Sequence, residues 1–467
     1  MTVAAAAAPL ADERRRRRVL VAAAVTQGAI NFDFFAMNMA LPEMARDLGT
    51  TITGLQWVVS GYLIALGACF VAGGRMGDIF GRKRLLIIGV LVFAATSAVA
   101  GAGTDPTMVI VFRVAQGLGA AIAFPVSLAV VTNAFPPARV ERAIGLVFGI
   151  AVVGTAAGPF VGGLLTETLS WRFVFWVNVP IAIIVVWLVA TSVTESRDES
   201  VPRHLDVAGL LLIVAGVASI SFAFDTASDR GWTSAGTIGL IVAGLVLLVA
   251  FVLVEARVRY PLLDLSLFRI REFDVMISAG TAANAVYTVV IFASIVYLQQ
   301  VRELSPIEAG VVFLALSIGA SIAGQISGRV ERFPSWLVMA AAMVVGGLGT
   351  VGLSWAVEWW LYVPCFAATG LGLGLAWAFS SVATQAVVPP AKAGEASGVV
   401  LTILVGVAGL AVAVGSSIIE THGDTNLEAA VQWLIRVAGI VAVLGAAVVS
   451  LVGRPHHGPG ADSISRA

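Results

Sequence analysis

The sequence predicts an all-α polytopic membrane protein with fourteen transmembrane helices. Hydrophobic residues make up 59% of the 467 residues and charged residues only 12%, and the mean hydropathy is +0.96. This composition is typical of proteins that cross the bilayer many times. The net charge of +0 gives no indication of a nucleic-acid partner, so the information lies in how the charges are distributed.

Fourteen apolar runs are each long enough to cross a bilayer, because a spanning helix needs about 20 predominantly apolar residues. The first run follows a stretch of arginines, but it is too long for the core of a signal peptide and no small-residue cleavage site closes it. We therefore expect an uncleaved first helix. The predicted helices cover residues 19–41, 55–76, 85–103, 107–131, 143–165, 172–192, 206–225, 235–256, 273–298, 308–328, 335–356, 359–385, 395–419 and 430–452.

The basic residues predict the orientation of these helices, since Lys and Arg accumulate in cytoplasmic loops. With the N-terminus inside, 22 of the 28 Lys and Arg residues fall in inner segments and four in outer segments. A miscounted helix would scramble this asymmetry in every later loop. The sequence thus predicts a multi-pass protein of the cytoplasmic cell membrane with both termini in the cytoplasm.

Cysteine and histidine give no indication of a disulfide or a metal site. Cys69 and Cys365 both lie inside apolar runs. His456 and His457 are adjacent in the C-terminal tail, where we interpret them as solvated side chains. No bound metal is expected.

A polar segment between the second and third runs, GRMGDIFGRKRLL from Gly74 to Leu86, combines glycines, one carboxylate and basic residues. One interpretation is a charged loop whose sole role is to fix the topology of the helices. The alternative is gating: in the outward-open state, Asp78 would lie at the N-terminus of the thirteenth helix near residues 394–397, and Arg82 would pair with an acid such as Glu141. The segment resembles the signature loop between helices 2 and 3 of the major facilitator superfamily. The residues assigned to gating are Gly74, Asp78, Gly81, Arg82, Lys83 and Glu141.

Three polar residues, Asn31, Asp33 and Asn38, interrupt the first apolar run. An ionisable side chain inside a span costs about 2.5–3.5 kcal/mol on insertion scales, so we interpret Asp33 as functional. A carboxylate hydrated near the outer surface is the alternative. The run from Phe32 to Pro42 resembles the first-helix signature of the fourteen-helix drug:proton antiporter branch, although Phe35 stands where Thr is common.

The fourth run contains Arg113 and Gln116, which are three residues apart and share a helix face. A guanidinium does not lose its proton in a protein, so Arg113 needs an anion or a hydrated cavity. The pattern resembles the fourth-helix motif of the superfamily. This resemblance implies that Arg113 tunes a nearby carboxylate in proton transfer, and it assigns proton coupling to Asp33, Arg113 and Gln116.

The fifth run contains closely spaced glycines and one proline. Glycines at such spacing permit close helix packing, and proline bends a helix. The pattern is similar to the antiporter motif of exporters with this fold, and it indicates export. Its residues are Gly154, Gly158, Pro159, Gly162 and Gly163.

The resemblance covers essentially the whole chain between its tails and implies the major facilitator fold. Two six-helix bundles related by pseudo-twofold symmetry are expected, with two inserted helices between them and a central site framed chiefly by helices 1, 4, 9 and 12. The expected divisions are a basic cytoplasmic tail (1–18), the N-terminal bundle (19–193), the inserted helices with flanking cytoplasmic loops (194–272), the C-terminal bundle (273–452) and a cytoplasmic tail (453–467). The side chains assigned to substrate binding are Gln27, Asn31, Asn38, Asn284, Tyr287, Tyr297 and Trp377.

The leading hypothesis is a proton-coupled secondary transporter that exports hydrophobic or amphipathic drugs or antibiotics by alternating access. We expect a monomer in the lipid bilayer that takes small lipophilic substrates, cationic or neutral, and uses the proton gradient without a cofactor. A dedicated exporter of an endogenous secondary metabolite is the alternative within transport. A non-transporting membrane receptor is the alternative from another class, and an enzyme is not expected because no nucleotide-binding loop or catalytic domain is visible.

Overall fold

The structure is a computed structural model that describes residues 2–197, 206–259, 261–263, 265–327, 329–330, 332–388 and 393–453. Within these residues the chain is helical and contains no strand. Fourteen helical segments are long and apolar enough to cross a membrane. The predicted all-α class and the number of spans are therefore confirmed.

Helices and spans do not correspond one to one. Some spans consist of more than one helix, whereas the single helix α14 contains two spans. The thirteenth and fourteenth spans are Gly398–Thr421 and Asn426–Val452, while α6 and α7 together form the sixth. The helices are α1 (Thr2–Asp47), η1 (Thr53–Leu55), α2 (Gln56–Phe80), α3 (Arg82–Gly101), α4 (Pro106–Ala134), α5 (Pro137–Thr168), α6 (Arg172–Trp176), α7 (Asn178–Ser192), α8 (Val207–Arg230), α9 (Ala235–Glu255), η2 (Leu265–Arg269), α10 (Arg271–Val296), η3 (Tyr297–Val301), α11 (Pro306–Ser327), α12 (Ser335–Leu353), α13 (Trp359–Ala386) and α14 (Ala393–Val452).

Local sequence determines where several helices begin. The Asp105 side chain accepts a hydrogen bond from Met108 N at 2.9 Å, and Pro106 takes the first position of α4. Within α14, Asn426 has non-helical backbone angles (φ −163°, ψ 95°), and its side chain accepts from Ala429 N at 3.0 Å. Asn426 therefore caps the last span after a break in the helix axis.

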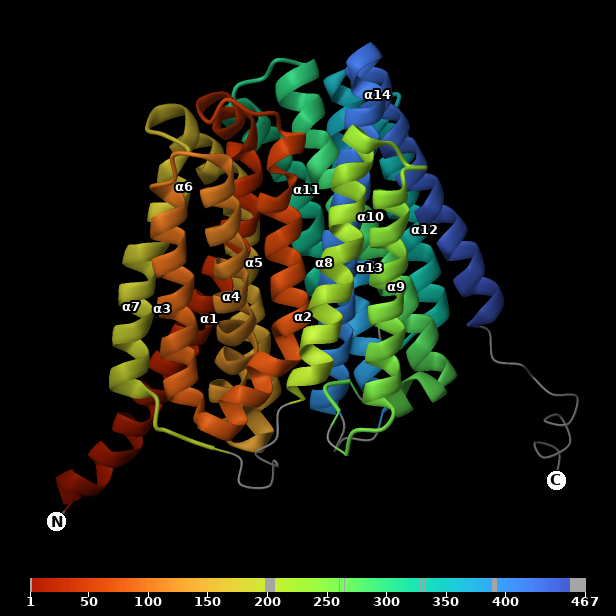
Figure 1. The fold of residues 1–467 in the computed structure, drawn as a ribbon. Coiled ribbons are helices and arrows are strands. Elements are labelled where there is room, and N and C mark those ends of the chain that lie inside the picture. The colour runs from red at the N-terminus through yellow and green to blue at the C-terminus, as the bar shows by residue number, and fades with distance from the viewer. Residues whose placement is uncertain are drawn as a thin grey trace, which may run out of the picture.

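The helices form two bundles that lie side by side (Figure 1). In the first, α1 packs against α5 and α7, and α2 packs against α4; in the second, α10 packs against α14, and α13 packs against α11 and α12. The pairs α2–α14 and α5–α11 join the bundles. The inserted helices α8 and α9 pack on each other, and α8 also contacts α2 and α14. The predicted two bundles with two inserted helices are confirmed.

The first helix begins earlier than the apolar run alone suggests. α1 starts at Thr2 and so includes most of the basic segment assigned to the tail. Arg15 attaches this segment to the end of α7, because its Nε donates to Ser192 O at 2.8 Å and its Nη2 donates to Thr194 Oγ1 at 2.7 Å.

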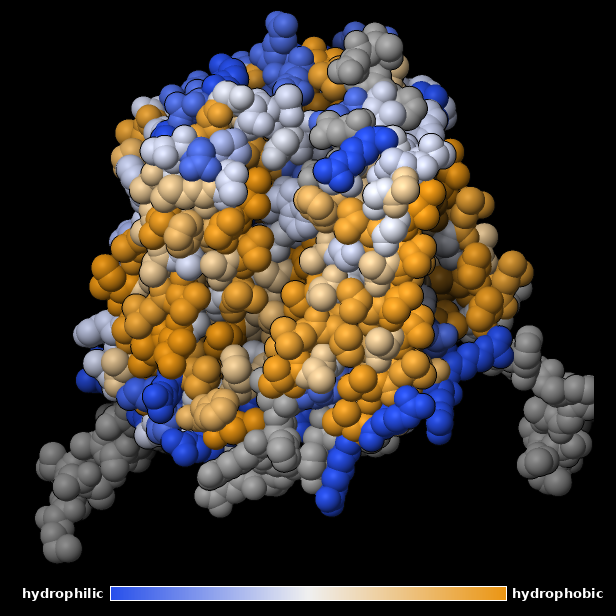
Figure 2. Space-filling model, viewed as in Figure 1, coloured by the Kyte–Doolittle hydropathy of each residue, from blue (hydrophilic) through white to orange (hydrophobic). Residues whose placement is uncertain are grey.

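The surface has the hydropathy pattern of a protein that crosses a bilayer. Hydrophobic side chains cover the middle of the visible face, and hydrophilic side chains gather at its two ends (Figure 2). The start of α1 and the end of α14 lie at the same end of the molecule (Figure 1). Large apolar side chains such as Leu245, Val246 and Trp360 are exposed, as expected for groups that face lipid.

Candidate functional site

Asp33 of α1 lies at the centre of a buried polar network in the first bundle. Its Oδ2 accepts a hydrogen bond from Arg113 Nη1 of α4, in an ion pair whose two side chains have no exposed surface. Gln116 Nε2, one turn along α4, donates to Asp33 Oδ1 at 2.9 Å. The structure thus brings together the three side chains assigned to proton coupling.

Arg113 is also held by α2 and by its own helix. Its Nε donates to Val58 O at 3.0 Å, its Nη1 donates to Gln116 Oε1 at 2.9 Å, and its guanidinium carbon lies 4.0 Å from the centroid of the Tyr62 ring. Its Nη2 is buried and makes no hydrogen bond. A guanidinium offers five N–H donors, so one edge of Arg113 still has a donor for an additional acceptor.

Asn178 completes the network from α7, and sequence reasoning did not assign it to the site. Its Nδ2 donates to Asp33 Oδ1 at 2.6 Å and to Ser97 Oγ of α3 at 3.0 Å. Ser97 in turn donates to Phe175 O at 2.9 Å. The carboxylate of Asp33 therefore connects four helices of one bundle, because Arg113 and Asn178 link α1 to α4 and α7 and Ser97 extends the network to α3.

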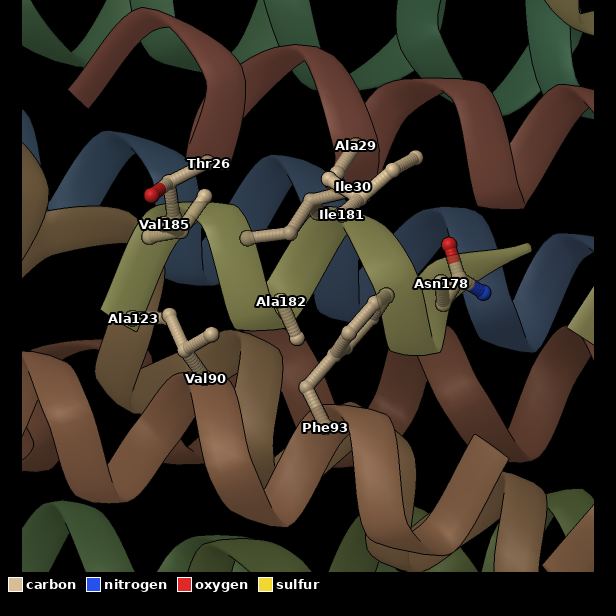
Figure 3. Close-up of a pocket in the computed structure, with 10 residues that line it drawn as sticks. All are labelled: Thr26, Ala29, Ile30, Val90, Phe93, Ala123, Asn178, Ile181, Ala182 and Val185. Carbon is tan, nitrogen blue, oxygen red and sulfur yellow. The ribbon is translucent and has the colours of Figure 1, made fainter. Parts of the chain in front are cut away.

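A small cavity lies beside this network, between α1, α3, α4 and α7 (Figure 3). Asn178 lies at one end of its lining and Thr26 at the other. Its volume of about 20 Å³ admits about one water molecule. It is therefore too small for an organic substrate in this conformation. The lining residues are Thr26, Ala29, Ile30, Val90, Phe93, Ala123, Asn178, Ile181, Ala182 and Val185.

The antiporter-type glycines of α5 lie where two neighbouring helices approach closely. A Cβ on Gly162 would be 2.6 Å from Ala36 Cα, and one on Gly158 would be 2.7 Å from Phe35 Cβ. Gly154 meets the backbone of Gly28, so these three glycines pack α5 against α1. Larger side chains would separate the two helices.

The opposite side of the same motif packs α5 against α11. Gly163 lies against the backbone of Pro306, and a Cβ on Gly310 would lie 2.6 Å from Pro159 O. The motif therefore joins α5 both to α1 within the bundle and to α11 of the other bundle.

The segment of residues 74–86, to which gating was assigned and which we call the gating segment, forms a tight turn between α2 and α3. Gly81 has a φ of +113°, a conformation that disfavours side chains, and a Cβ there would lie 2.6 Å from Glu195 Oε1. Glu195 accepts from Lys83 N at 3.1 Å and from Arg84 N at 3.2 Å, which satisfies two N–H groups at the start of α3. Sequence reasoning missed Glu195 because it lies in the loop after α7, far along the chain.

Arg82 pairs within its own segment in this conformation. Its Nη2 lies 2.8 Å from Oδ1 of Asp78, four residues earlier. The pairing expected in the outward-open state, with an acid such as Glu141, stays a prediction, because the side chain of Glu141 lies outside the described part of the structure. The predicted approach of Asp78 to residues 394–397 also stays a prediction, because most of those side chains are not described. Gly74 lies close to Pro125 of α4, and Lys83 Nζ donates to Ala190 O at 2.7 Å.

Three amide side chains assigned to substrate binding make hydrogen bonds to backbone or side-chain groups of the helices, either between two helices or between successive turns of one helix. Gln27 Nε2 donates to Phe124 O at 2.9 Å and to Ser127 Oγ at 2.8 Å, which links α1 to α4. Asn284 Nδ2 donates to Leu404 O at 2.9 Å and so links α10 to α14. Asn38 donates to Phe34 O of its own helix at 2.6 Å.

The other four candidates lie in different environments. Tyr297 is buried and stacks on Tyr362 with ring centroids 5.8 Å apart, and Tyr287 is buried with a hydroxyl that has no hydrogen-bond partner. Asn31 is half-buried, and Trp377 is 42% exposed. Among the described contacts, no hydrogen bond or ring contact joins any two of the seven candidates. Their assignment to one binding site stays a prediction.

Comparisons with known proteins place these features in a wider group. A family model described as the Major Facilitator Superfamily matches residues 23–403 and 275–466. The tetracenomycin C resistance and export protein of Streptomyces glaucescens is 32% identical over 74% of this chain, which spans 63% of that protein's length. The puromycin resistance protein pur8 of Streptomyces alboniger is 33% identical over 79% of this chain and 75% of its own length. The multidrug resistance protein Stp of Mycobacterium tuberculosis is 33% identical over 79% of this chain and 70% of its own length.

Solved structures share the fold at low sequence identity. The POT family transporter PepTSo has a TM-score of 0.68 and 14% identity, with 94% of this chain and 98% of that chain covered. The nucleoside transporter NupG, as a D323A mutant, has a TM-score of 0.69 and 12% identity, with 94% and 100% covered. These matches support the arrangement of helices.

Proposed function

This chain belongs to the major facilitator superfamily, a family of transport proteins, and from that premise we propose that it exports small lipophilic compounds in exchange for protons. The names of its relatives, which include antibiotic resistance and multidrug resistance proteins, support the direction and the class of substrate. The cytoplasmic membrane is the proposed location, with both termini inside. That orientation is supported by the excess of Lys and Arg in the inner segments.

The observation that carries the proposal is the buried ion pair of Asp33 and Arg113. An ionised carboxylate only accepts hydrogen bonds, and here three donors converge on it from Arg113, Gln116 and Asn178. A protonated carboxyl has in addition an O–H group that must donate. Proton binding therefore adds a fourth donor where three already converge, and the network has to rearrange to supply an acceptor for it.

This rearrangement would transmit proton binding to the helices. When Asp33 is neutral, Arg113 lacks its counter-ion while it still donates to Val58 O of α2. Removing one partner of a buried ion pair costs about 3–5 kcal/mol if nothing replaces it. The carrier is thus driven to another conformation, in which Arg113 becomes hydrated or finds a new acceptor. With Asp33 charged, the same carboxylate could attract a cationic substrate, so proton and substrate would compete.

The two bundles would open and close around this site in alternation. The end of α5 that carries Gly163 packs on the start of α11. Gly145 and Gly149 lie on the same face of α5 nearer its other end, and a Cβ on either would meet no neighbour within 4 Å. Gly324, near the end of α11, is equally open. Close packing at one end of the α5–α11 pair and space at the other supports a conformation closed on the outer side.

Reconstituted transport tests this proposal. The purified chain, placed in liposomes without any other protein, should move a lipophilic cationic dye against its gradient when a pH gradient is imposed. A proton flux in the opposite direction should accompany the dye. Dye binding without movement would support the receptor alternative, and movement that is indifferent to the pH gradient would remove proton exchange from the account.

A second candidate is the dedicated export of one endogenous metabolite, and the name of the tetracenomycin C export protein favours it. A panel of dyes, antibiotics and aromatic natural products distinguishes the two. Transport of many unrelated lipophilic compounds supports a multidrug exporter. Transport restricted to one chemical scaffold supports the dedicated exporter.

A further inference from the structure

A pair of buried carboxylates lies at the ends of the inserted helices, outside the Asp33 network. Asp206 immediately precedes α8, Glu255 is the last residue of α9, and their exposed fractions are only 9% and 3%. Each engages one oxygen with a backbone N–H group. Asp206 Oδ1 accepts from Gly209 N at 2.8 Å, and Glu255 Oε2 accepts from Leu263 N at 3.0 Å.

The two remaining oxygens point at the same place. A Cβ on Gly209 would lie 2.6 Å from Asp206 Oδ2 and 2.6 Å from Glu255 Oε1. Both oxygens are buried, and neither has a hydrogen-bond partner among the residues that the structure describes. Two ionised carboxylates in this arrangement would repel each other in a poorly hydrated environment and would leave two acceptors unsatisfied.

In the described contacts, no basic side chain of a neighbouring element forms an ion pair with Asp206 or Glu255. Arg75 of α2 donates to Pro261 O at 3.1 Å, Arg257 donates to Leu253 O at 3.3 Å, and Arg271 of α10 donates to Val452 O at 2.8 Å. Other charged or titratable groups in these elements and the adjoining loops include Asp78, Arg259, Arg269, Glu272 and Asp274, together with Arg203, His204, Tyr260 and Asp264, which lie outside the described residues.

We infer that Asp206 and Glu255 bind one proton between them and form a second protonation site, separate from Asp33. One protonated carboxyl can donate to the free oxygen of the other, so a single proton satisfies both buried oxygens and removes one of the two like charges. The proton comes from water at the cytoplasmic face and returns there. This site goes beyond the proposed function, since it does not require transport in either direction.

Proton binding at this pair would control the segment that follows α9. Glu255 holds Leu263 N, and Leu263 packs in an apolar cluster with Phe273 of α10 and Val400 of α14. Two residues earlier, Pro261 O accepts from Arg75 in the gating segment. The short stretch 261–263 therefore connects the inserted helices to both bundles at one end of the molecule. When the pair loses its proton, repulsion displaces Glu255 and releases this stretch.

Infrared spectroscopy of the purified full chain tests the site directly, since a protonated carboxyl has a C=O band that a carboxylate lacks. The wild type should lose carboxyl absorption as the pH rises from about 5 to about 9, a range that covers strongly raised carboxyl pKa values. Asp206→Asn and Glu255→Gln should each remove this change. Asp33→Asn should retain it, which separates this site from the proposed coupling site. The exposed control Glu272→Gln should also retain it.

Hydrogen exchange at the Leu263 amide provides a second readout, which can be measured in the wild type itself and then compared with variants. In the wild type, protection corrected for the intrinsic rate should fall about tenfold across the titration, the loss expected for one hydrogen bond. Glu255→Gln keeps an acceptor for Leu263 N and offers an N–H to Asp206, so its protection should be high and independent of pH. Gly209→Ala should lower protection at every pH, because its methyl group would occupy the place where the two oxygens meet.

Three results would overturn the inference. The first is an unchanged carboxyl band in the Asp206→Asn/Glu255→Gln double variant. The second is Leu263 protection in the wild type that does not change with pH. The same conclusion would follow if the pH dependence of this protection disappeared in His204→Asn or Asp264→Asn but persisted in Glu255→Gln. The third is protection at low pH that a chelator abolishes and calcium restores, which would make the ligand a divalent cation.

Discussion

The two bundles of this protein differ in what their interiors contain. The first bundle buries an ion pair, Asp33 with Arg113, and surrounds it with the amides of Gln116 and Asn178. In the described part of the second bundle, every buried residue of the polar or charged class is a serine or a threonine. Many of these hydroxyls, such as that of Thr350, donate to a carbonyl one turn earlier in the same helix. Among the buried residues of the two bundles that the structure describes, only those of the first bundle therefore include a carboxylate that can change its charge.

In the proposed transport cycle, the two halves would divide the work. A proton that binds in the first bundle would change the number of charges there and require a rearrangement of hydrogen bonds between helices. The second bundle offers tyrosines, hydroxyls and apolar surface, which suit a lipophilic substrate and are indifferent to pH over the physiological range. We therefore expect substitutions of matched burial to have unequal effects in the two bundles.

The largest contrast is expected between Arg113→Ala and Thr350→Ala. The first leaves Asp33 buried without its counter-ion and should lower the free energy of unfolding by about 3–5 kcal/mol. The second removes one neutral hydroxyl, which donates to Gly346 O of its own helix and at 3.3 Å to Thr369 Oγ1 of α13, and it should cost at most about 1.5 kcal/mol. Thermal unfolding of both variants in the same detergent measures the difference. Equal destabilisation would remove the contrast between the bundles.

A smaller contrast is expected between Asn178→Ala and Ser317→Ala, two fully buried polar positions. Asn178 donates to a charged acceptor, so its loss should cost about 1.5–3 kcal/mol. Ser317 Oγ has no hydrogen-bond partner, so its loss should be nearly neutral or slightly stabilising. If Ser317→Ala proves as damaging as Asn178→Ala, the second bundle contains a polar network of comparable importance.

The smallest contrast concerns the surface carboxylates Asp78 and Glu308. The Asp78–Arg82 pair is partly exposed and should be worth about 0.2–1 kcal/mol, or up to about fivefold in a conformational equilibrium. Asp78→Asn should slow efflux by about that factor while substrate binding survives. Glu308→Gln, which keeps an acceptor for Ser305 N at the start of α11, should leave the rate within about twofold. Efflux rates in liposomes compare the two, and an unaffected Asp78→Asn would show that this pair has no part in gating.

The spans were predictable because hydropathy and length act over some 20 residues at a time and few alternatives satisfy both. The break at Asn426 falls between the predicted runs 395–419 and 430–452, although the helix continues on both sides without a long loop. The beginning of α1 at Thr2 was not predicted. The alanines and arginines there favour helix, but they do not form the apolar run from which the spans were predicted.

The site was predictable to the extent that its residues are costly in a membrane. Asp33 and Arg113 are conspicuous because a charge in an apolar run needs a partner, and the structure brings the two together. Asn178 is neutral, so its cost in a span is smaller and sequence alone did not assign it a role. For Arg82 the expectation concerned a more distant acid such as Glu141 in the outward-open state. In this conformation the turn at Gly81 keeps the two helix ends close, and Arg82 pairs with Asp78, four residues away.

The most direct test of the account is proton-driven efflux by Asp33→Asn, a change that preserves shape and removes the charge. Liposomes with the variant should show no efflux powered by a pH gradient, because its side chain resembles the protonated carrier at every pH. Neutral substrates should still bind, while cationic substrates should bind more weakly. Full proton-driven efflux by Asp33→Asn, at wild-type rate and with wild-type proton flux, would contradict the account and place proton coupling elsewhere in the molecule.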